Sequence, residues 1–186
     1  GDLALLCYFK YSAFVMWNVE SISGLQLGWE SFELPLGISF FTFQQIAYLV
    51  DVYREGRQQG GALRYSVFVT FFPQLIAGPI VHHKDLIPQL TQELTALERR
   101  DRLVRGMALF TVGMFKKVVL ADNVGAIANV AFARVHDGVA LGGGEAWLGA
   151  LAYSAQIYLD FSAYSDMAIG LGLMFGLRIP DNFRFP

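Results

Sequence analysis

The sequence has little of what carries covalent or nucleic-acid chemistry in soluble proteins. Its 186 residues include one cysteine and three histidines, and only 16% of them are charged. Because Cys7 is alone, no internal disulfide can form, and its apolar neighbours predict a small buried core residue. The net charge is −2, and no Lys/Arg cluster resembles a patch for nucleic-acid phosphates. We therefore expect no nucleic-acid partner.

The sequence also lacks the motifs that mark common active sites and metal sites. It contains no Gly-x-Ser-x-Gly elbow of the kind that presents a nucleophilic serine. The histidines His82, His83 and His136 have no further His or Cys at ligand spacing. We therefore predict no metal site, and we place these histidines at the surface or at an interface.

Apolar residues are what the sequence has in excess, at 54% of the chain, with aromatic residues at 15% and a positive mean hydropathy. Several charge-free runs approach the ~17–25 residues that a helix needs to cross a bilayer. The composition predicts an all-α, polytopic transmembrane protein; a soluble helical domain with a buried core is the alternative. The chain begins without Met and shows no signal-peptide pattern, so we expect a fragment of a longer polypeptide in which residues 1–186 form a single membrane domain.

The first half of the chain contains three long apolar runs. Residues 3–19 are expected to form a spanning or steeply inserted helix. Residues 34–50 form the second run, opened by Pro35, which the start of a helix tolerates. Gln44 and Gln45 lie in its middle and should turn toward protein rather than lipid.

The third run, residues 65–81, carries helix-breaking residues. Pro73 lies inside it, and Gly78 and Pro79 lie near its end. Proline removes a backbone donor and kinks a helix. One interpretation is a kinked or re-entrant element that lines the interior of the protein, and the other is a short helix followed by an interfacial loop.

Residues 82–105 are rich in charged and polar side chains and predict a surface segment. Thr95 and Glu98 have the spacing of a capping box for the helix that follows. Three arginines come next: Arg99, Arg100 and Arg102. We expect them at the level of the lipid headgroups, on the cytoplasmic side because of the basic excess.

Residues 106–133 are apolar except at Lys116-Lys117 and Asp122-Asn123. The pattern fits either two short helices that meet at a polar break or one interfacial helix with its charges on a single face. Lys117 and Asp122 are five residues apart, so a regular helix offers no clean i,i+4 ion pair between them. The glycine-rich residues 134–145 predict a flexible loop.

The last third of the chain places two carboxylates, Asp160 and Asp166, between charge-free runs at 146–159 and 167–177. An intramembrane carboxylate is expensive and is usually retained for pairing or function. At about 100° per residue, Asp160 shares a helix face with Tyr153, Gln156 and Tyr164, whereas Ser162 and Asp166 point elsewhere. Such a helix must be enclosed by other helices or border a water-filled cavity.

Glycines follow these carboxylates at Gly170, Gly172 and Gly176. Their spacing does not fit a dinucleotide-binding loop, and no strand precedes them. Gly172 and Gly176 instead have the small-xxx-small spacing that lets membrane helices approach closely. We therefore predict that these glycines pack helices together.

Four blocks of sequence, residues 35–54, 71–80, 158–170 and 180–183, resemble the membrane-bound O-acyltransferase family. The second block reads Phe-Phe-Pro-Gln-Leu-Ile-Ala-Gly-Pro-Ile, and the third and fourth are similar to the alginate O-acetyltransferase branch. The resemblance to D-alanyl transfer proteins of teichoic acid synthesis is weaker. Ala163 departs from the branch, in which a glycine is common at this position.

This resemblance implies a multi-pass enzyme of the bacterial inner membrane that passes an acetyl group from a cytoplasmic donor to an extracytoplasmic polysaccharide such as alginate. It implies contact with membrane lipid and with periplasmic acetyltransferase partner proteins, no bound cofactor, and an acyl donor that the residues do not define. The essential histidine of the family is expected beyond Pro186, so the fragment alone should be inactive. The alternative function is that of a transporter or channel segment.

The resemblance also suggests which residues line the central funnel of such an enzyme. We expect the helix over 158–166 and the broken element over 72–79 to line it. The candidates are Gln156, Tyr158, Asp160, Ser162, Tyr164, Asp166, Pro73, Gly78 and Pro79. We expect Asp160 and Asp166 to orient the site or to hold neighbouring helices, with a direct acid or base role as the alternative.

Overall fold

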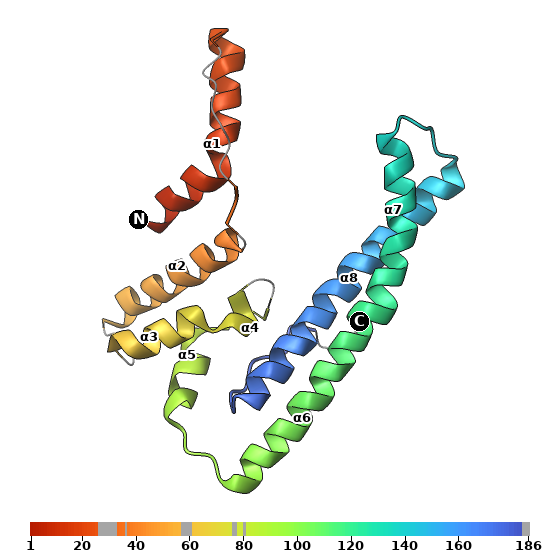
Figure 1. Cartoon of the computed structure of the whole chain (residues 1–186). Helices are drawn as coiled ribbons and strands as arrows, with labels where there is room; N and C mark the ends of the chain where they lie inside the picture. Colours follow the sequence, from red (N-terminus) through yellow and green to blue (C-terminus); the bar gives the residue numbers. More distant parts are fainter. Residues whose placement is uncertain (26–32, 36, 57–60, 76–77, 80, 184–186) are drawn as a thin grey trace. The chain divides into compact units, whose positions relative to one another are not determined.

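The computed structural model describes residues 1–25, 33–35, 37–56, 61–75, 78–79 and 81–183, and all regular elements within these residues are helices (Figure 1). The all-α prediction is therefore confirmed. Contacts between residues divide the chain into two compact units, Gly1–Ile76 and Ala77–Pro186. That both belong to a single membrane domain stays a prediction.

The first unit begins with two long helices that pack against each other, α1 (Asp2–Ser23) and α2 (Ile38–Glu55). No residue of α1 is buried, although the helix is strongly apolar. The other described residues therefore leave its apolar side chains uncovered. Cys7 lies on this helix and is exposed, so the prediction of a buried cysteine is wrong. The described residues leave its face of α1 uncovered.

α2 begins at Ile38, three residues after the proline that opens the apolar run in the sequence. Pro35 lies before the helix, and Gly37 forms the N-cap with a left-handed backbone (φ 71°) that favours glycine. Gln45 is half-buried and faces protein as predicted. Its Oε1 accepts a hydrogen bond from the hydroxyl of Tyr65, at 3.1 Å.

The next two helices of this unit, α3 (Gly61–Thr70) and α4 (Phe72–Leu75), are separated by a break at Phe71. With 10 residues, α3 is about 15 Å long, half of a bilayer core. Pro73 is buried in α4, and Gln74 donates from Nε2 to the carbonyl of Phe68 at 2.6 Å. The predicted break in helicity is confirmed. Whether the segment is re-entrant or interfacial stays a prediction.

The second unit opens with a compact stretch that contains α5 (His83–Leu86) and the 3₁₀ helix η1 (Ile87–Thr91). His83 is only 3% exposed, which contradicts its predicted place at the surface or an interface. The reason is its register, because His83, Leu86 and Ile87 lie at positions i, i+3 and i+4 of one helical face, and that face is buried. The neighbouring His82 and the distant His136 are exposed.

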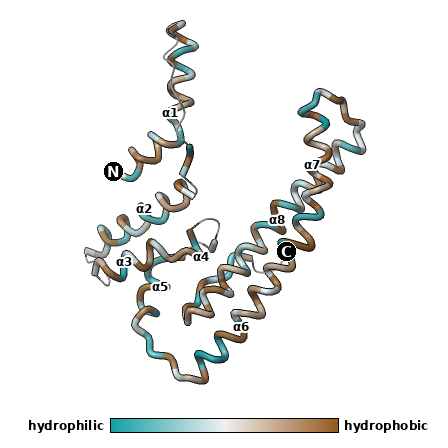
Figure 2. Tube along the Cα trace, in the orientation of Figure 1, coloured by the Kyte–Doolittle hydropathy of each residue, from teal (hydrophilic) through white to brown (hydrophobic). Residues whose placement is uncertain are grey.

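One long rod dominates the second unit. It consists of α6 (Ala96–Phe115), the π-helical segment η2 (Lys116–Ala121) and α7 (Asp122–His136). The rod is continuous over 41 residues, so the alternative of two short helices is wrong. Within the described residues it is the one helix whose length and composition suit a membrane crossing. Hydrophilic residues at the start of α6 give way to hydrophobic ones along the rod (Figure 2).

The start of the rod is fixed by the predicted capping box. The side-chain oxygen of Thr95 accepts from the backbone N–H of Glu98 at 3.3 Å, and the carboxylate of Glu98 accepts from the backbone N–H of Thr95 at 2.9 Å. Two backbone donors that the helix leaves without partners are satisfied in this way. The sequence therefore placed the beginning of α6 correctly.

The last helix, α8 (Gly143–Met174), returns antiparallel to the rod and packs along α6, η2 and α7 (Figure 1). The predicted loop at 134–145 is shorter in the structure, because α7 continues to His136 and Gly143 already lies in the first turn of α8. The guanidinium of Arg134 lies 2.7 Å from the carboxylate of Glu145 across this turn. That contact and the N–H of Gly142 hold the pKa of the Glu145 carboxyl below its usual value.

Small residues bring α8 into backbone contact with the rod. A Cβ added at Gly106 would lie 2.6 Å from the carbonyl oxygen of Gly170, and one added at Gly113 would lie 2.7 Å from that of Ala163. The two contacts are seven residues apart on each helix, the repeat of a coiled-coil seam. The predicted packing role of Gly170 is confirmed. We call these four residues the glycine seam.

Gly172 and Gly176 do not join helices, so that prediction is wrong. Gly176 lies after the end of α8 with φ 80°, and its N–H donates to the carbonyl of Leu173 at 2.9 Å. The N–H of Leu177 donates to the carbonyl of Gly172 at 2.8 Å, which completes a Schellman motif. The chain then folds back, and Ile179 contacts Gly172.

The segment after α8 is held by side chains from earlier elements. Gln89 binds Arg178 twice, accepting from its N–H at 2.8 Å and donating to its carbonyl at 2.9 Å. The guanidinium of Arg102 donates to the carbonyl of Gly176. Arg102 is only 7% exposed, whereas Arg99 and Arg100 are exposed, and the location of the three arginines at the level of the headgroups stays a prediction.

Candidate functional site

The first polar contact between the rod and α8 is made by Lys116 of the rod. Its Nζ lies 2.6 Å from Oδ2 of Asp166 and 3.2 Å from Oγ of Ser162. The side chains of Lys116 and Asp166 are 32% and 19% exposed, and Ser162 is buried. This is a partly buried, charge-assisted contact between two helices that are far apart in sequence.

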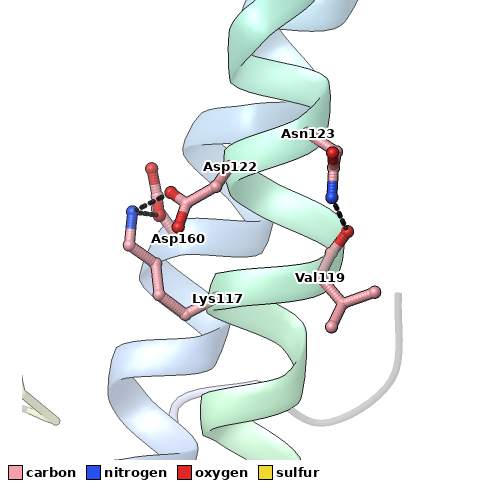
Figure 3. Close-up of polar contacts among 5 residues, drawn as sticks. All are labelled: Lys117, Val119, Asp122, Asn123 and Asp160. Atoms are coloured by element: carbon pink, nitrogen blue, oxygen red, sulfur yellow. Dashed lines mark hydrogen bonds and ion pairs between the residues drawn. The ribbon is translucent and has the colours of Figure 1, made fainter.

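The neighbouring Lys117 binds two carboxylates at once (Figure 3). Its Nζ lies 2.7 Å from Oδ1 of Asp160 on α8 and 2.7 Å from Oδ1 of Asp122 on α7. One ammonium therefore links α8 to the part of the rod that follows the π segment. We call these residues, together with Lys116, Ser162 and Asp166, the Lys–Asp cluster.

The π segment explains how Lys117 can reach Asp122. The backbone N–H of Asp122 donates to the carbonyl of Lys117, five residues back instead of four. One turn thus contains an additional residue, and side chains five apart stack above one another. The prediction that no regular i,i+4 pair can form holds for a regular helix, but the helix is not regular at this point.

The Lys–Asp cluster lies far from both ends of the apolar stretches of the rod and of α8. At 1.5 Å per residue, Lys116 is about 15 Å from the start and about 25 Å from the end of the apolar stretch 106–133. Asp160 is similarly about 20 Å from each end of the helical part of its apolar stretch, residues 146–174. Charged groups at such depth are costly unless they pair with one another, as these do.

The two carboxylates of α8 meet different partners, as their spacing predicted. They leave the helix about 120° apart, yet both turn toward the rod. This is possible because Lys116 and Lys117 are adjacent in sequence and their long side chains reach out to either side of α8. A single partner helix therefore supplies a countercharge to both carboxylates of a helix that is polar on two sides.

The arrangement leaves hydrogen-bonding capacity for a bound group. A lysine ammonium has three N–H donors. Lys117 uses two on Asp160 and Asp122, and Lys116 uses two on Asp166 and Ser162. Because Lys117 is also 40% exposed, it can donate to an oxygen atom of a ligand without giving up its carboxylates.

The other candidate residues on α8 lie around this cluster with different exposure. The amide of Gln156 occupies the space that a side chain at Gly125 of α7 would need. Tyr158 is 41% exposed, and its ring lies 5.7 Å from that of Phe183 in an edge-to-face contact. Tyr164 is half-buried.

The candidates in the broken element, Pro73, Gly78 and Pro79, are all buried. Pro73 belongs to the first unit, and Gly78 and Pro79 belong to the second. Their role in lining a funnel stays a prediction, as does that of the α8 candidates. In the part of the chain that the structure describes, no group of three or more His, Cys, Asp or Glu side chains could hold a metal ion.

Sequence reasoning did not identify Lys116 and Lys117 as site residues. The signal was nevertheless there, because two lysines interrupt one apolar run and two aspartates interrupt another. Intramembrane charges of opposite sign are expected to find each other. The sequence did not predict the π turn, which decides which lysine pairs with which aspartate.

Comparison with known proteins shows which family and which characterised proteins the chain is similar to. The model of the membrane-bound O-acyltransferase family matches residues 4–186. Over its whole length the chain is 44% identical to "Probable alginate O-acetylase AlgI" of Pseudomonas putida and 39% identical to "Peptidoglycan O-acetyltransferase" of Helicobacter pylori. It is 29% identical, over 81% of its length, to "Teichoic acid D-alanyltransferase" of Bacillus subtilis. The chain spans 38%, 40% and 38% of these three proteins, respectively.

Proposed function

Because this chain belongs to the membrane-bound O-acyltransferase family, as its sequence motifs predicted, we propose that it is part of a membrane enzyme that transfers an acetyl group to an extracytoplasmic polysaccharide such as alginate. The observation that carries this proposal is the 44% identity, over the whole chain, to an alginate O-acetylase. The lower identity of 29% to a D-alanyltransferase favours acetyl over D-alanyl transfer. Family membership also disfavours a transporter or channel.

In this proposal the chain shapes the route to the reaction rather than performing it. The 158–166 part of α8 and the broken element with Pro73, Gly78 and Pro79 line the route of the reactants. The Lys–Asp cluster holds α8 in register against the rod. The essential histidine comes from outside residues 1–186, which agrees with the chain spanning only 38% of the alginate O-acetylase that it resembles.

The proposed setting is the bacterial inner membrane, which the complete protein crosses several times. The donor delivers its acetyl group from the cytoplasmic side, and the acceptor lies on the other side. Periplasmic acetyltransferase proteins are the expected partners. No bound cofactor and no nucleic acid enter the proposal.

Peptidoglycan is a second candidate acceptor, because the chain is also 39% identical to a peptidoglycan O-acetyltransferase. The full-length protein should be produced in alginate-forming cells that lack their own membrane O-acetylase but keep their periplasmic acetyltransferase proteins, and alkali-labile acetate should be measured on alginate and on peptidoglycan. We expect acetate on alginate. Acetate on peptidoglycan alone would assign the second acceptor, and acetate on neither, at normal membrane abundance, would refute the proposal.

A variant of the Lys–Asp cluster connects this test to the structure. Lys117→Met in the full-length protein should lower acetate transfer at least about tenfold, because α8 loses one of its two charged links to the rod and Asp160 loses its countercharge. Arg105→Gln is the matched control, since Arg105 lies on the same rod and pairs with Asp101 at an exposed position. Normal acetylation in Lys117→Met would remove the cluster from the proposal without affecting the acceptor assignment.

A further inference from the structure

Four arginines lie close together at the start of α6, and two of them are already engaged. Arg102 is buried, and its guanidinium donates to the carbonyl of Gly176. Arg105 pairs with Asp101, with 3.0 Å between Nε and Oδ2. Both guanidinium groups therefore have a partner within the protein. The remaining two arginines, Arg99 and Arg100, differ from them in this respect.

Arg99 and Arg100 are exposed, and neither forms an ion pair within the described residues. Both line a cavity of about 490 Å³. The rest of its lining consists of Leu94, Ala96 and Leu103. The cavity thus combines two positive charges with an apolar wall, and none of the described residues that line it carries a carboxylate.

A second cavity, of about 780 Å³, shares Arg99 and Leu94 with the first and extends to the end of α8. Phe175 and Leu177 supply an apolar surface there. Among the described residues that line it, Glu93 is the only acidic one. Together the two cavities offer a cationic end at Arg99 and Arg100 and an apolar surface that continues from it.

The depth of this site is set by the helix itself. Arg99 and Arg100 precede Gly106, where the apolar stretch of the rod begins, by six or seven residues, or about 10 Å along the axis. The headgroup region extends roughly 5–8 Å beyond the hydrocarbon core on each side. A guanidinium on a long side chain at this position reaches the phosphates of the lipid leaflet.

We propose that Arg99 and Arg100 form a binding site for the phosphate of an anionic phospholipid of the phosphatidylglycerol type. The phosphate accepts hydrogen bonds from the two guanidinium groups, whose planar donors suit its oxygen atoms. An acyl chain runs over Leu94 and Leu103. This occupant matches both halves of the site, because a soluble phosphate would leave the apolar wall exposed. Glu93 disfavours a second negative charge in the larger cavity.

The test uses the full-length protein, purified in detergent and titrated with phosphatidylglycerol, with retained lipid counted by native mass spectrometry. The double variant Arg99→Gln/Arg100→Gln should bind phosphatidylglycerol on the order of thirty-fold more weakly, about 1 kcal/mol for each arginine lost. Arg105→Gln is the matched control, because it removes one charge from the same helix. It should stay within about twofold of the parent protein.

Two further measurements distinguish lipid binding at this site from a loss of folding and from binding of a soluble phosphate. The thermal unfolding midpoint of the double variant should equal that of the parent protein, because neither arginine makes an ion pair within the described residues. Soluble glycerol phosphate should compete with the lipid at least about a hundredfold more weakly, since it lacks the acyl chains. Unchanged lipid binding in the double variant, or equal competition by glycerol phosphate, would overturn the proposal.

Discussion

At the scale of single residues, the two lysines of the Lys–Asp cluster are not equivalent. Lys117 has two carboxylates, Asp160 and Asp122, whereas Lys116 has one carboxylate and a hydroxyl. Removing Asp160 therefore leaves Lys117 paired, and removing Asp166 leaves Lys116 with Ser162 alone. An ammonium without a countercharge in an apolar setting is costly.

We therefore predict that Asp166→Asn destabilises the full-length protein more than Asp160→Asn does. The expected losses are about 2–4 kcal/mol and about 1 kcal/mol, respectively. Thermal unfolding in detergent and abundance in the membrane would measure both. Asp101→Asn, which breaks an exposed pair with Arg105, should change little. Equal losses in the two cluster variants would contradict the asymmetry.

Neutralising both partners at once provides the complementary test. The double variant Lys116→Met/Asp166→Leu should be more stable than Lys116→Met alone, because no isolated charge remains. If the double variant were no more stable than Lys116→Met, the pair would stabilise the protein through its geometry and not through charge balance.

The histidines separate into two kinds at this scale. We expect His82→Gln and His136→Gln to retain most of the O-acetylation activity in cells, because both side chains are exposed. His83→Gln should lower membrane abundance instead, because the residue is buried in the face that it shares with Leu86 and Ile87. Activity per molecule should stay constant in all three variants. A loss of specific activity at normal abundance would show that one of them acts in catalysis.

At the scale of helices, close approach of α8 and the rod depends on the glycine seam. A side chain at Gly113 would collide with the backbone of Ala163 and with Met167, neither of which can move without shifting α8. Gly113→Leu should therefore cost about 3 kcal/mol or more, the upper end of what overpacking costs. Gly144→Leu is the control, since nothing lies within 4 Å of the added Cβ. A melting temperature unchanged by Gly113→Leu would mean that the helices are not held this closely.

The helices and their caps could largely be predicted from the sequence, whereas the contacts between helices and the irregular turns could not. The Thr95 capping box and the break around Pro73 follow from local chemistry, and the structure contains both. The packing role predicted for Gly176 is wrong because small-xxx-small spacing does not say where a helix ends. The π turn could not be predicted from local sequence, and its Lys117 pairs with Asp160, which is 43 residues away. For the same reason, the burial of His83 and Arg102 could not be predicted, since it depends on segments that pack against them.

At the scale of the whole molecule, the rod predicts which segments share a side of the membrane. Its two ends are about 60 Å apart, more than the thickness of a bilayer. Positive charges near a span favour the cytoplasmic side, so the Arg99 end should be cytoplasmic and the α7–α8 turn should lie outside the cytoplasm.

Single cysteines would test this orientation, because Cys7→Ser leaves a chain of this sequence without any other thiol. In a full-length protein made cysteine-free in the same way, Val139→Cys should react with a membrane-impermeant thiol reagent in intact spheroplasts. Leu97→Cys should react only in inverted vesicles. Both parent side chains are exposed, at 45% and 77%. Labelling of both cysteines from the same side would refute the crossing.

The π segment also has a consequence at the level of the gene, where it amounts to a single additional codon. Deleting the codon for Val119 would let the helix close as a regular α-helix and would place Lys117 and Asp122 four residues apart, a spacing at which they can still pair. Everything after the deletion would keep its helical face, because the π turn stacks residues five apart as a regular turn stacks residues four apart, and Gly125 would still face Gln156. Loss of Val119 should therefore be tolerated, whereas deleting the codon for Val112 in the regular helix α6 would rotate the residues after it by about 100°, turn Gly113 away from Ala163 and abolish accumulation of the full-length protein, as a codon-deletion scan with immunoblotting would reveal.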